Sequence, residues 1–193
     1  MTTSETELAL ETRTGLPDTL RVLIDDYPRE AWEADPNFSG LIRFWLDRHL
    51  MFRRLAGTMI SEAEQALDAA MEERRYGAHL SRYGSMFVGE LHGHHAIEDM
   101  HYFPVMKTLD ARVARGFDIL DRDHHAIDGH LAAFAEAANA TLRRIAEGQT
   151  ARDDIAALLG DLNRVQAFLN RHLEDEEDLV VPVLLKYAPT GLV

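Results

Sequence analysis

Histidine and glutamate recur four residues apart in two short stretches of this sequence. His94 precedes Glu98 and His172 precedes Glu176, so each stretch contains a His-x-x-x-Glu pattern. On an α-helix, residues four apart project from the same face, one turn above the other. An imidazole and a carboxylate held side by side can bind a transition metal such as iron, zinc or manganese. The two stretches therefore predict two related halves of a metal site.

A proline that follows each stretch sets the register between the two copies. The histidine lies ten residues before Pro104 or Pro182, and the glutamate lies six residues before the same proline. In this register His95 corresponds to Leu173, so the repeat favours His94 over His95 as the ligand. Two copies in register with a proline are far more specific than one isolated pair.

The rest of the chain predicts helices that would position these side chains. Apolar residues recur with helical spacing in four long stretches, and no segment alternates as a strand would. The expected helices cover residues 39–74, 79–109, about 110–147 and about 150–188. The predicted fold class is all-α: an up-down-up-down antiparallel four-helix bundle with a short N-terminal helical extension.

Each of the four apolar stripes contains a histidine, and their spacing suggests a shared height in the bundle. Equal-height residues on consecutive antiparallel helices should have the connecting turn midway between them. For His49, His94, His124 and His172 the midpoints fall at 71.5, 109 and 148, and composition places the breaks near 75, 109 and 148. This predicts one site built by all four helices. The arithmetic cannot choose between His124 and His125, because one residue barely moves a midpoint.

These motifs resemble the hemerythrin-like, or HHE, family over residues 39–188. The resemblance implies two Fe ions in the core of the bundle, joined by two glutamates and an oxo or hydroxo group. An open iron position would take oxygen, peroxide or nitric oxide. The ligands that it implies are His49, His94, Glu98, His124, His172 and Glu176.

Oxygen-carrying members of the family use five histidines, and the four motif positions here supply four. A fifth could come from His101 or His125. His101 takes the place of Leu179 in the repeat and lies one turn beyond Glu98, so we expect it to point inward and to hydrogen-bond near the metals rather than bind them. A structural zinc site would need about four ligands, so six favour a dinuclear site.

Regions outside the motifs predict the domain organisation. Residues 1–38 form an N-terminal extension, disordered to about residue 16 and then briefly helical from Pro17; residues 39–188 form the bundle, and 189–193 a tail. In the acidic run 174–178, every residue except Glu176 is expected to face water.

Composition narrows the classes of function. The 193-residue chain carries a net charge of −13, which argues against nucleic acid or an anionic membrane as the partner. It has no cysteine, which excludes thiol chemistry and fits a cytoplasmic location, and its polar start lacks the features of a signal peptide.

Three functional hypotheses remain open. The first is a di-iron protein that binds or senses oxygen or a related small ligand. The second is an enzyme that uses the same site to consume peroxide or nitric oxide. The third is an iron-responsive interaction module whose N-terminal extension contacts a protein partner of unknown identity.

Overall fold

The protein is mostly helical in the part of the chain that the structure describes. The structure is a computed structural model, and it describes residues 6–189 and residue 192. No strand occurs among these residues, as predicted, and none of their helices has the length and apolar character needed to cross a lipid bilayer. The elements are a 3-10 helix η1 (Arg29–Ala34), α1 (Gly40–Leu67), α2 (Glu73–Ile97), a π-helical turn η2 (Glu98–Tyr102), α3 (Phe103–Leu109), α4 (Ala114–Ala146) and α5 (Arg152–Tyr187).

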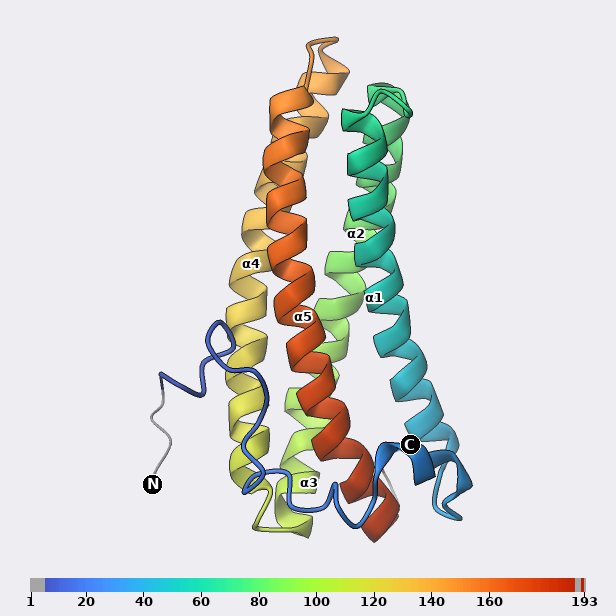
Figure 1. The fold of residues 1–193 in the computed structure, drawn as a ribbon, viewed down its shortest axis with the longest axis vertical. Helices are drawn as coiled ribbons and strands as arrows, with labels where there is room; N and C mark the ends of the chain where they lie inside the picture. The colour runs from blue at the N-terminus through green and yellow to red at the C-terminus, as the bar shows by residue number, and fades with distance from the viewer. Residues whose placement is uncertain (1–5, 190–191, 193) are drawn as a thin grey trace. The chain divides into compact units, whose positions relative to one another are not determined.

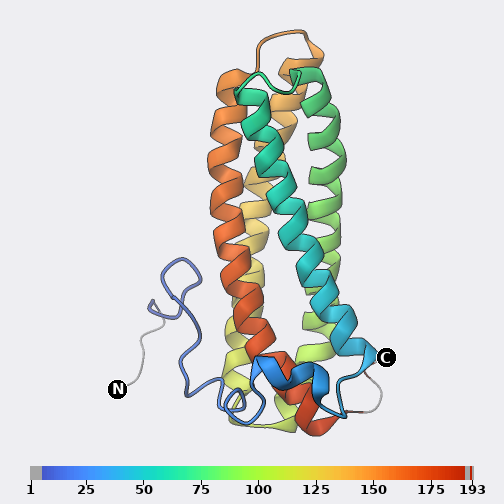
Figure 2. The same ribbon diagram turned by 45° about the vertical axis from the view of Figure 1, so that its right-hand side comes forward.

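The chain divides into two compact units. Unit 1 contains Met1–Leu50, His94–Ala126 and Asn170–Val193, and unit 2 contains Met51–Gly93 and Ile127–Leu169. Within each unit, four helical segments lie side by side and alternate in direction (Figures 1 and 2). This is the predicted up-down-up-down arrangement.

Unit 1 has an apolar core to which the helices and the N-terminal segment (residues 6–35) both contribute. Ile42 and Trp45 come from α1, and Phe117 comes from α4, where its ring lies 5.2 Å from that of Phe103. Burial of one such side chain stabilises the fold by about 1.5–3 kcal/mol. The N-terminal segment adds Leu8, Leu16, Leu23 and Trp32 to the same core.

Between α2 and α3 the helix widens into η2. The backbone N–H of Phe103 donates to the carbonyl of Glu98, five residues earlier, instead of four. Pro104 stands in the first turn of α3 and has no N–H to donate, so an α-helical bond to Met100 is impossible. The irregularity before Pro104 is therefore an extra residue in one helical turn, while Pro182 lies inside an unbroken α5.

Unit 2 packs around apolar side chains from all four of its helical segments. Phe87 and Phe134 meet edge to face, with ring centroids 6.4 Å apart. The connection between α4 and α5 turns at Gly148, which has φ of 71°. Gly77 lies inside α2, where an added Cβ would approach Ile145 to 3.3 Å.

The helix ends agree with two of the three predicted breaks. Those near 109 and 148 are confirmed, but the composition-based break at 75 is wrong, because α1 ends at Leu67 and α2 begins at Glu73. The midpoint of His49 and His94 gave the better position. Gly77, which follows residue 75, lies inside α2 and permits close packing against Ile145 rather than a turn.

The N-terminal prediction also needs correction. Residues 6–16, which were expected to be disordered, are placed as turns that bury Leu8 and Leu10, while residues 1–5 lie outside the described part. The helix expected from Pro17 is replaced by successive turns as far as Tyr27, before η1. Short helices are marginal by themselves, so packing against α4 and α5 decides the conformation (Figures 1 and 2).

Candidate metal centre

Seven side chains from four helices and η2 converge inside unit 1 and form two groups of possible metal ligands. In each group, one ligand atom per residue lies within 4.8 Å of the others. The first cluster consists of His49 from α1, His94 from α2, Glu98 from η2 and Glu176 from α5. The second cluster consists of His95 from α2, His124 from α4 and His172 from α5. All six predicted ligand residues thus lie together, and His95 joins them.

The carboxylate of Glu98 lies between the two clusters. Its Oε1 is 2.9 Å from Nε2 of His94, and its Oε2 is 3.6 Å from Nε2 of His124. Neither oxygen has a partner in hydrogen-bonding geometry among the described residues. Glu98 therefore offers one oxygen to each cluster.

Glu176 has the matching position on α5. Its Oε1 is 3.5 Å from Nε2 of His49, and its Oε2 is 3.4 Å from Nε2 of His172. The indole N–H of Trp45 donates to Oε1 at 2.5 Å. Each of the two glutamates therefore has one oxygen near a histidine of the first cluster and the other near a histidine of the second.

The outer nitrogens of three histidines contact carboxylates. Nδ1 of His49 lies 3.0 Å from Glu177, Nδ1 of His124 lies 2.7 Å from Asp99, and Nδ1 of His172 lies 3.3 Å from Asp123. Each Nδ1–H can donate to its carboxylate, which leaves Nε2 free to bind a metal. The same three Nε2 atoms are the ones that face the glutamates.

The electrostatics of the site call for a cation. Burial raises the pKa of Glu98 well above its usual range, and the charge of nearby Glu176 adds to this rise. Burial also opposes ionisation of Glu176, but His49 and His172 outweigh it and lower the pKa of Glu176. Two buried carboxylates this close need a proton or a metal between them. The donor set of imidazoles and carboxylates fits iron, zinc or manganese.

His95 is the ligand candidate that the sequence repeat passed over. Its ring stacks on that of His124 with centroids 4.0 Å apart, and it is almost fully buried. Neither ring nitrogen has a hydrogen-bond partner among the described residues, which is costly unless the imidazole binds something else. The His-His doublet was the available signal, but Leu173 in the repeat argued against it.

The two residues suggested as a fifth histidine lie elsewhere. His101 is exposed, because the extra residue in η2 turns it away from the face that Glu98 occupies. His125 is exposed as well, and its Nδ1 lies 2.9 Å from the carbonyl oxygen of Asp121. The expectation that His101 points inward is therefore wrong.

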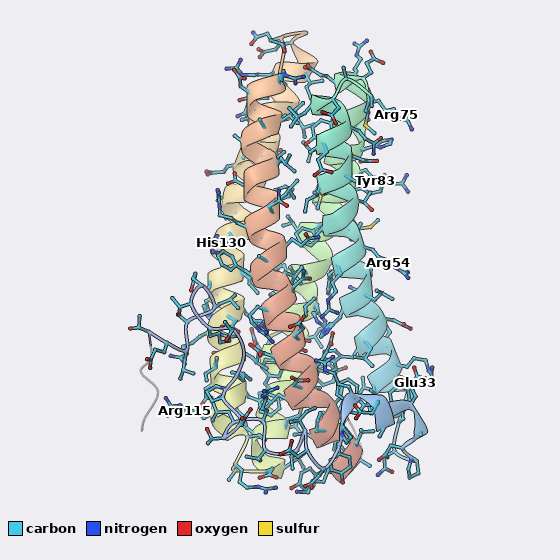
Figure 3. The ribbon with its side chains drawn as sticks, viewed as in Figure 1. Glu33, Arg54, Arg75, Tyr83, Arg115 and His130 are labelled. Atoms are coloured by element: carbon cyan, nitrogen blue, oxygen red, sulfur yellow. The ribbon has the colours of Figure 1, made fainter. Side chains whose placement is uncertain are left out.

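The remaining histidines belong to unit 2 and are paired there. His79 contacts Glu62 at 2.7 Å, and His92 lies 3.7 Å from Asp128. His130, labelled in Figure 3, lies against the ring of Phe168. None belongs to a group of candidate ligands among the described residues.

A small cavity reaches the first cluster. It has a volume of about 60 Å³ and contacts both His94 and Glu98. Its other walls are mainly apolar and include Phe44, Trp45 and Tyr102. The cavity is therefore small and suits a compact molecule rather than a large substrate.

A comparison with protein families identifies the architecture. The family model described as the hemerythrin HHE cation binding domain matches residues 40–184. Comparisons with curated proteins and with solved structures gave no significant match. The matched range contains both clusters, all of α1, α2 and α4, and α5 as far as Leu184. The chain therefore belongs to the hemerythrin HHE cation-binding domain family.

Proposed function

We propose that this protein holds two iron ions and binds or senses oxygen or a related small ligand such as peroxide or nitric oxide. His49 and His94 would bind one ion, and His95, His124 and His172 the other. Glu98 and Glu176 would bind both. When bound, a pair of irons with an open position supplies reversible binding of such small ligands.

The observation that carries this proposal is the placement of the two glutamates. Each directs one carboxylate oxygen toward a histidine of the first cluster and the other oxygen toward a histidine of the second. A single metal would need only one cluster. Two carboxylates that each face both clusters support a dinuclear centre.

The surroundings of the first cluster support a small, uncharged ligand. This cluster has two histidines where the second has three, and it borders the cavity of about 60 Å³. The mainly apolar walls, which include Trp45 and Tyr102, favour a compact uncharged molecule over a charged one. Exchange of a ligand is therefore expected at the metal position between His49 and His94.

The enzyme and interaction-module hypotheses receive less support. Turnover of peroxide needs a proton donor beside the ligand, and of the possible donors His101, His95 and Tyr102, His101 is exposed. The N-terminal segment, which was considered as a partner surface, packs against α4 and α5 of its own unit. Tyr102 lines the cavity, so its hydroxyl is the candidate proton donor that the enzyme hypothesis retains there.

Metal analysis of protein produced with iron tests the proposal. We expect about two irons per chain and an absorption spectrum that changes reversibly with oxygen. Glu98→Ala and Glu176→Ala should each lose most of the iron, whereas Glu174→Ala, in the same acidic run but exposed, should keep it. One zinc and no iron in the parent protein would refute the proposal.

A further inference from the structure

Three arginines of the N-terminal segment reach the acidic residues around the candidate metal centre. Arg13, Arg21 and Arg29 all form ion pairs with carboxylates of α4 or α5 in unit 1. The carboxylates paired with Arg13 and Arg29 include ones that also contact a histidine of the metal centre, whereas those paired with Arg21 do not. An arginine that only attaches the segment can therefore be distinguished from one that also acts on the metal centre.

Arg13 is connected to His172 through one carboxylate. Its Nη1 donates to Oδ1 of Asp123 at 2.8 Å, and its Nη2 donates to Oδ2 of the same group. Oδ2 in turn lies 3.3 Å from Nδ1 of His172. The Nε of Arg13 donates to Asp175 at 2.8 Å, and the arginine side chain is only 2% exposed. Asp123 is therefore held on one side by the N-terminal segment and contacts a candidate ligand on the other.

Arg29 repeats this arrangement at the first cluster. Its Nη1 donates to Oε2 of Glu177 at 2.7 Å, and Oε1 of the same carboxylate lies 3.0 Å from Nδ1 of His49. Its Nε donates to Asp178 at 2.7 Å. Each cluster thus contains one histidine whose outer nitrogen faces a carboxylate fixed by an arginine of the N-terminal segment.

Arg21 offers a natural comparison. It binds Asp178 at 3.1 Å and Asp18 at 2.9 Å. The contacts of Asp178 among the described residues are with Arg21 and Arg29, and none is with a histidine. Arg21 and Arg29 have similar side-chain exposure, 33% and 42%. Arg21 therefore attaches the same segment to α5 without reaching a ligand.

We propose that Arg13 and Arg29 are positioning residues of the metal centre, through which the N-terminal segment sets the orientation of His172 and His49. A partner that orients a metal-binding histidine typically changes metal affinity 10–100-fold. The inference rests on the proposed function, because it concerns the same histidines. It also gives a role to the acidic run 174–178, of which Asp175, Glu177 and Asp178 are buried rather than facing water.

Lysine substitutions isolate the positioning effect from the effect of charge. Removing a positive charge near a metal would by itself favour metal binding, and would oppose the loss of orientation. Lysine keeps the charge but has no planar fork, so it cannot hold both oxygens of Asp123 and also reach Asp175. Arg13→Lys and Arg29→Lys therefore disturb the geometry at nearly constant charge. Arg21→Lys makes the same change where no histidine is reached.

Titration of the metal-free 193-residue chain with Co²⁺ provides the test, because the visible bands of Co²⁺ report its ligands. We expect Arg13→Lys and Arg29→Lys each to weaken the binding of one of the two ions by about 10-fold, the lower end of the usual range. The two variants should affect different steps of the titration. Arg21→Lys should bind as the parent protein does, and far-ultraviolet circular dichroism should show unchanged helix content in all three.

A double variant tests whether Arg13 acts through Asp123. Asp123→Asn alone should weaken one ion, and adding Arg13→Lys should change that affinity less than 2-fold further, because the shared contact is already disturbed. Parent-like affinity in both Arg13→Lys and Arg29→Lys would overturn the inference. An equal loss of Co²⁺ affinity in Arg21→Lys would overturn it too, since the segment would then stabilise the site only by packing over it and not through individual histidines. If the parent protein binds one Co²⁺, the dinuclear proposal fails, yet the variants still report on that ion.

Discussion

At the scale of single residues, the candidate centre depends on which side of α2 faces the interior of unit 1. His94 and His95 are neighbours in sequence and point about 100° apart on a helix, but one belongs to the first cluster and the other to the second. One helix thus contributes a histidine to both clusters. The histidines number two in the first cluster and three in the second, which leaves the first with more room for a small ligand.

We expect His95→Ala to lose one of the two metals selectively. The imidazole of His95 is buried, and neither of its nitrogens has a hydrogen-bond partner among the described residues. Loss of a partner that only orients a ligand costs 10–100-fold in affinity, so loss of a ligand should cost more than 10-fold. Equilibrium dialysis of iron under anaerobic conditions measures the effect. His101→Ala is the control and should retain both irons, because His101 is exposed.

At the scale of helices and turns, one extra residue decides which side chains follow Glu98 inward. The mapping of His101 onto Leu179 assumed that both helices continue with α-helical spacing. α5 does so, but η2 bonds five residues apart before Pro104. The widened turn brings Phe103 into the core of unit 1 and leaves His101 outside.

The close approach of α4 to α5 in unit 1 gives a prediction at this scale. A Cβ on Gly116 would lie 2.8 Å from a methyl carbon of Leu179, and Leu179 is itself buried. Gly→Ala inside a helix normally gains about 1 kcal/mol. In Gly116→Ala the overpacking should cancel that gain and cost about 1–3 kcal/mol.

Gly129, also in α4, is the control for this substitution. An added Cβ there has nothing within 4 Å, so Gly129→Ala should be neutral or stabilising. Denaturant unfolding of the metal-free protein should show a lower midpoint for Gly116→Ala than for Gly129→Ala. Equal midpoints would mean that the side chain of Leu179 moves aside without cost.

The sequence predicted most of what helical periodicity and local spacing control. The four long helices, two of three breaks and the gathering of His49, His94, His124 and His172 all follow from positions along the chain. The contacts of Arg13 with Asp123 and Asp175 could not be predicted, because they join residues 110 and 162 positions apart without any shared period. The π-helical turn could not be predicted for a different reason: a proline in a helix permits a kink, a bulge or a helix end, and the sequence does not decide among them.

At the scale of the whole molecule, metal and protons compete for the same histidines. Burial disfavours the charged imidazole of His172, but hydrogen bonds and charge from Asp123 and Glu176 outweigh it and raise its pKa to about 9 in the metal-free protein. The pKa of His94 falls to about 3, mainly because of burial, so His94 is neutral near pH 7. Metal binding near neutral pH must therefore displace a proton from His172.

This competition predicts how stability changes with pH. In the metal-free protein, the pKa of His172 is higher in the folded state, about 9, than in the unfolded chain, about 6.5. The stabilisation from the charged imidazole is then fully present below pH 6.5 and is lost as pH rises through 9. The shift corresponds to roughly 3 kcal/mol, or on the order of 10 °C in Tm for a chain of this size.

The metal-loaded protein should behave in the opposite way. Its histidines are already neutral, and metal affinity rises with pH because fewer protons have to be displaced. Since a ligand that binds only the folded state adds stability by mass action, the Tm of the iron-loaded protein should exceed that of the metal-free protein by an amount that grows between pH 6.5 and pH 9. Differential scanning calorimetry of both forms across this range measures the difference. A gap that stays constant or narrows would mean that His172 is not the proton that the metal displaces.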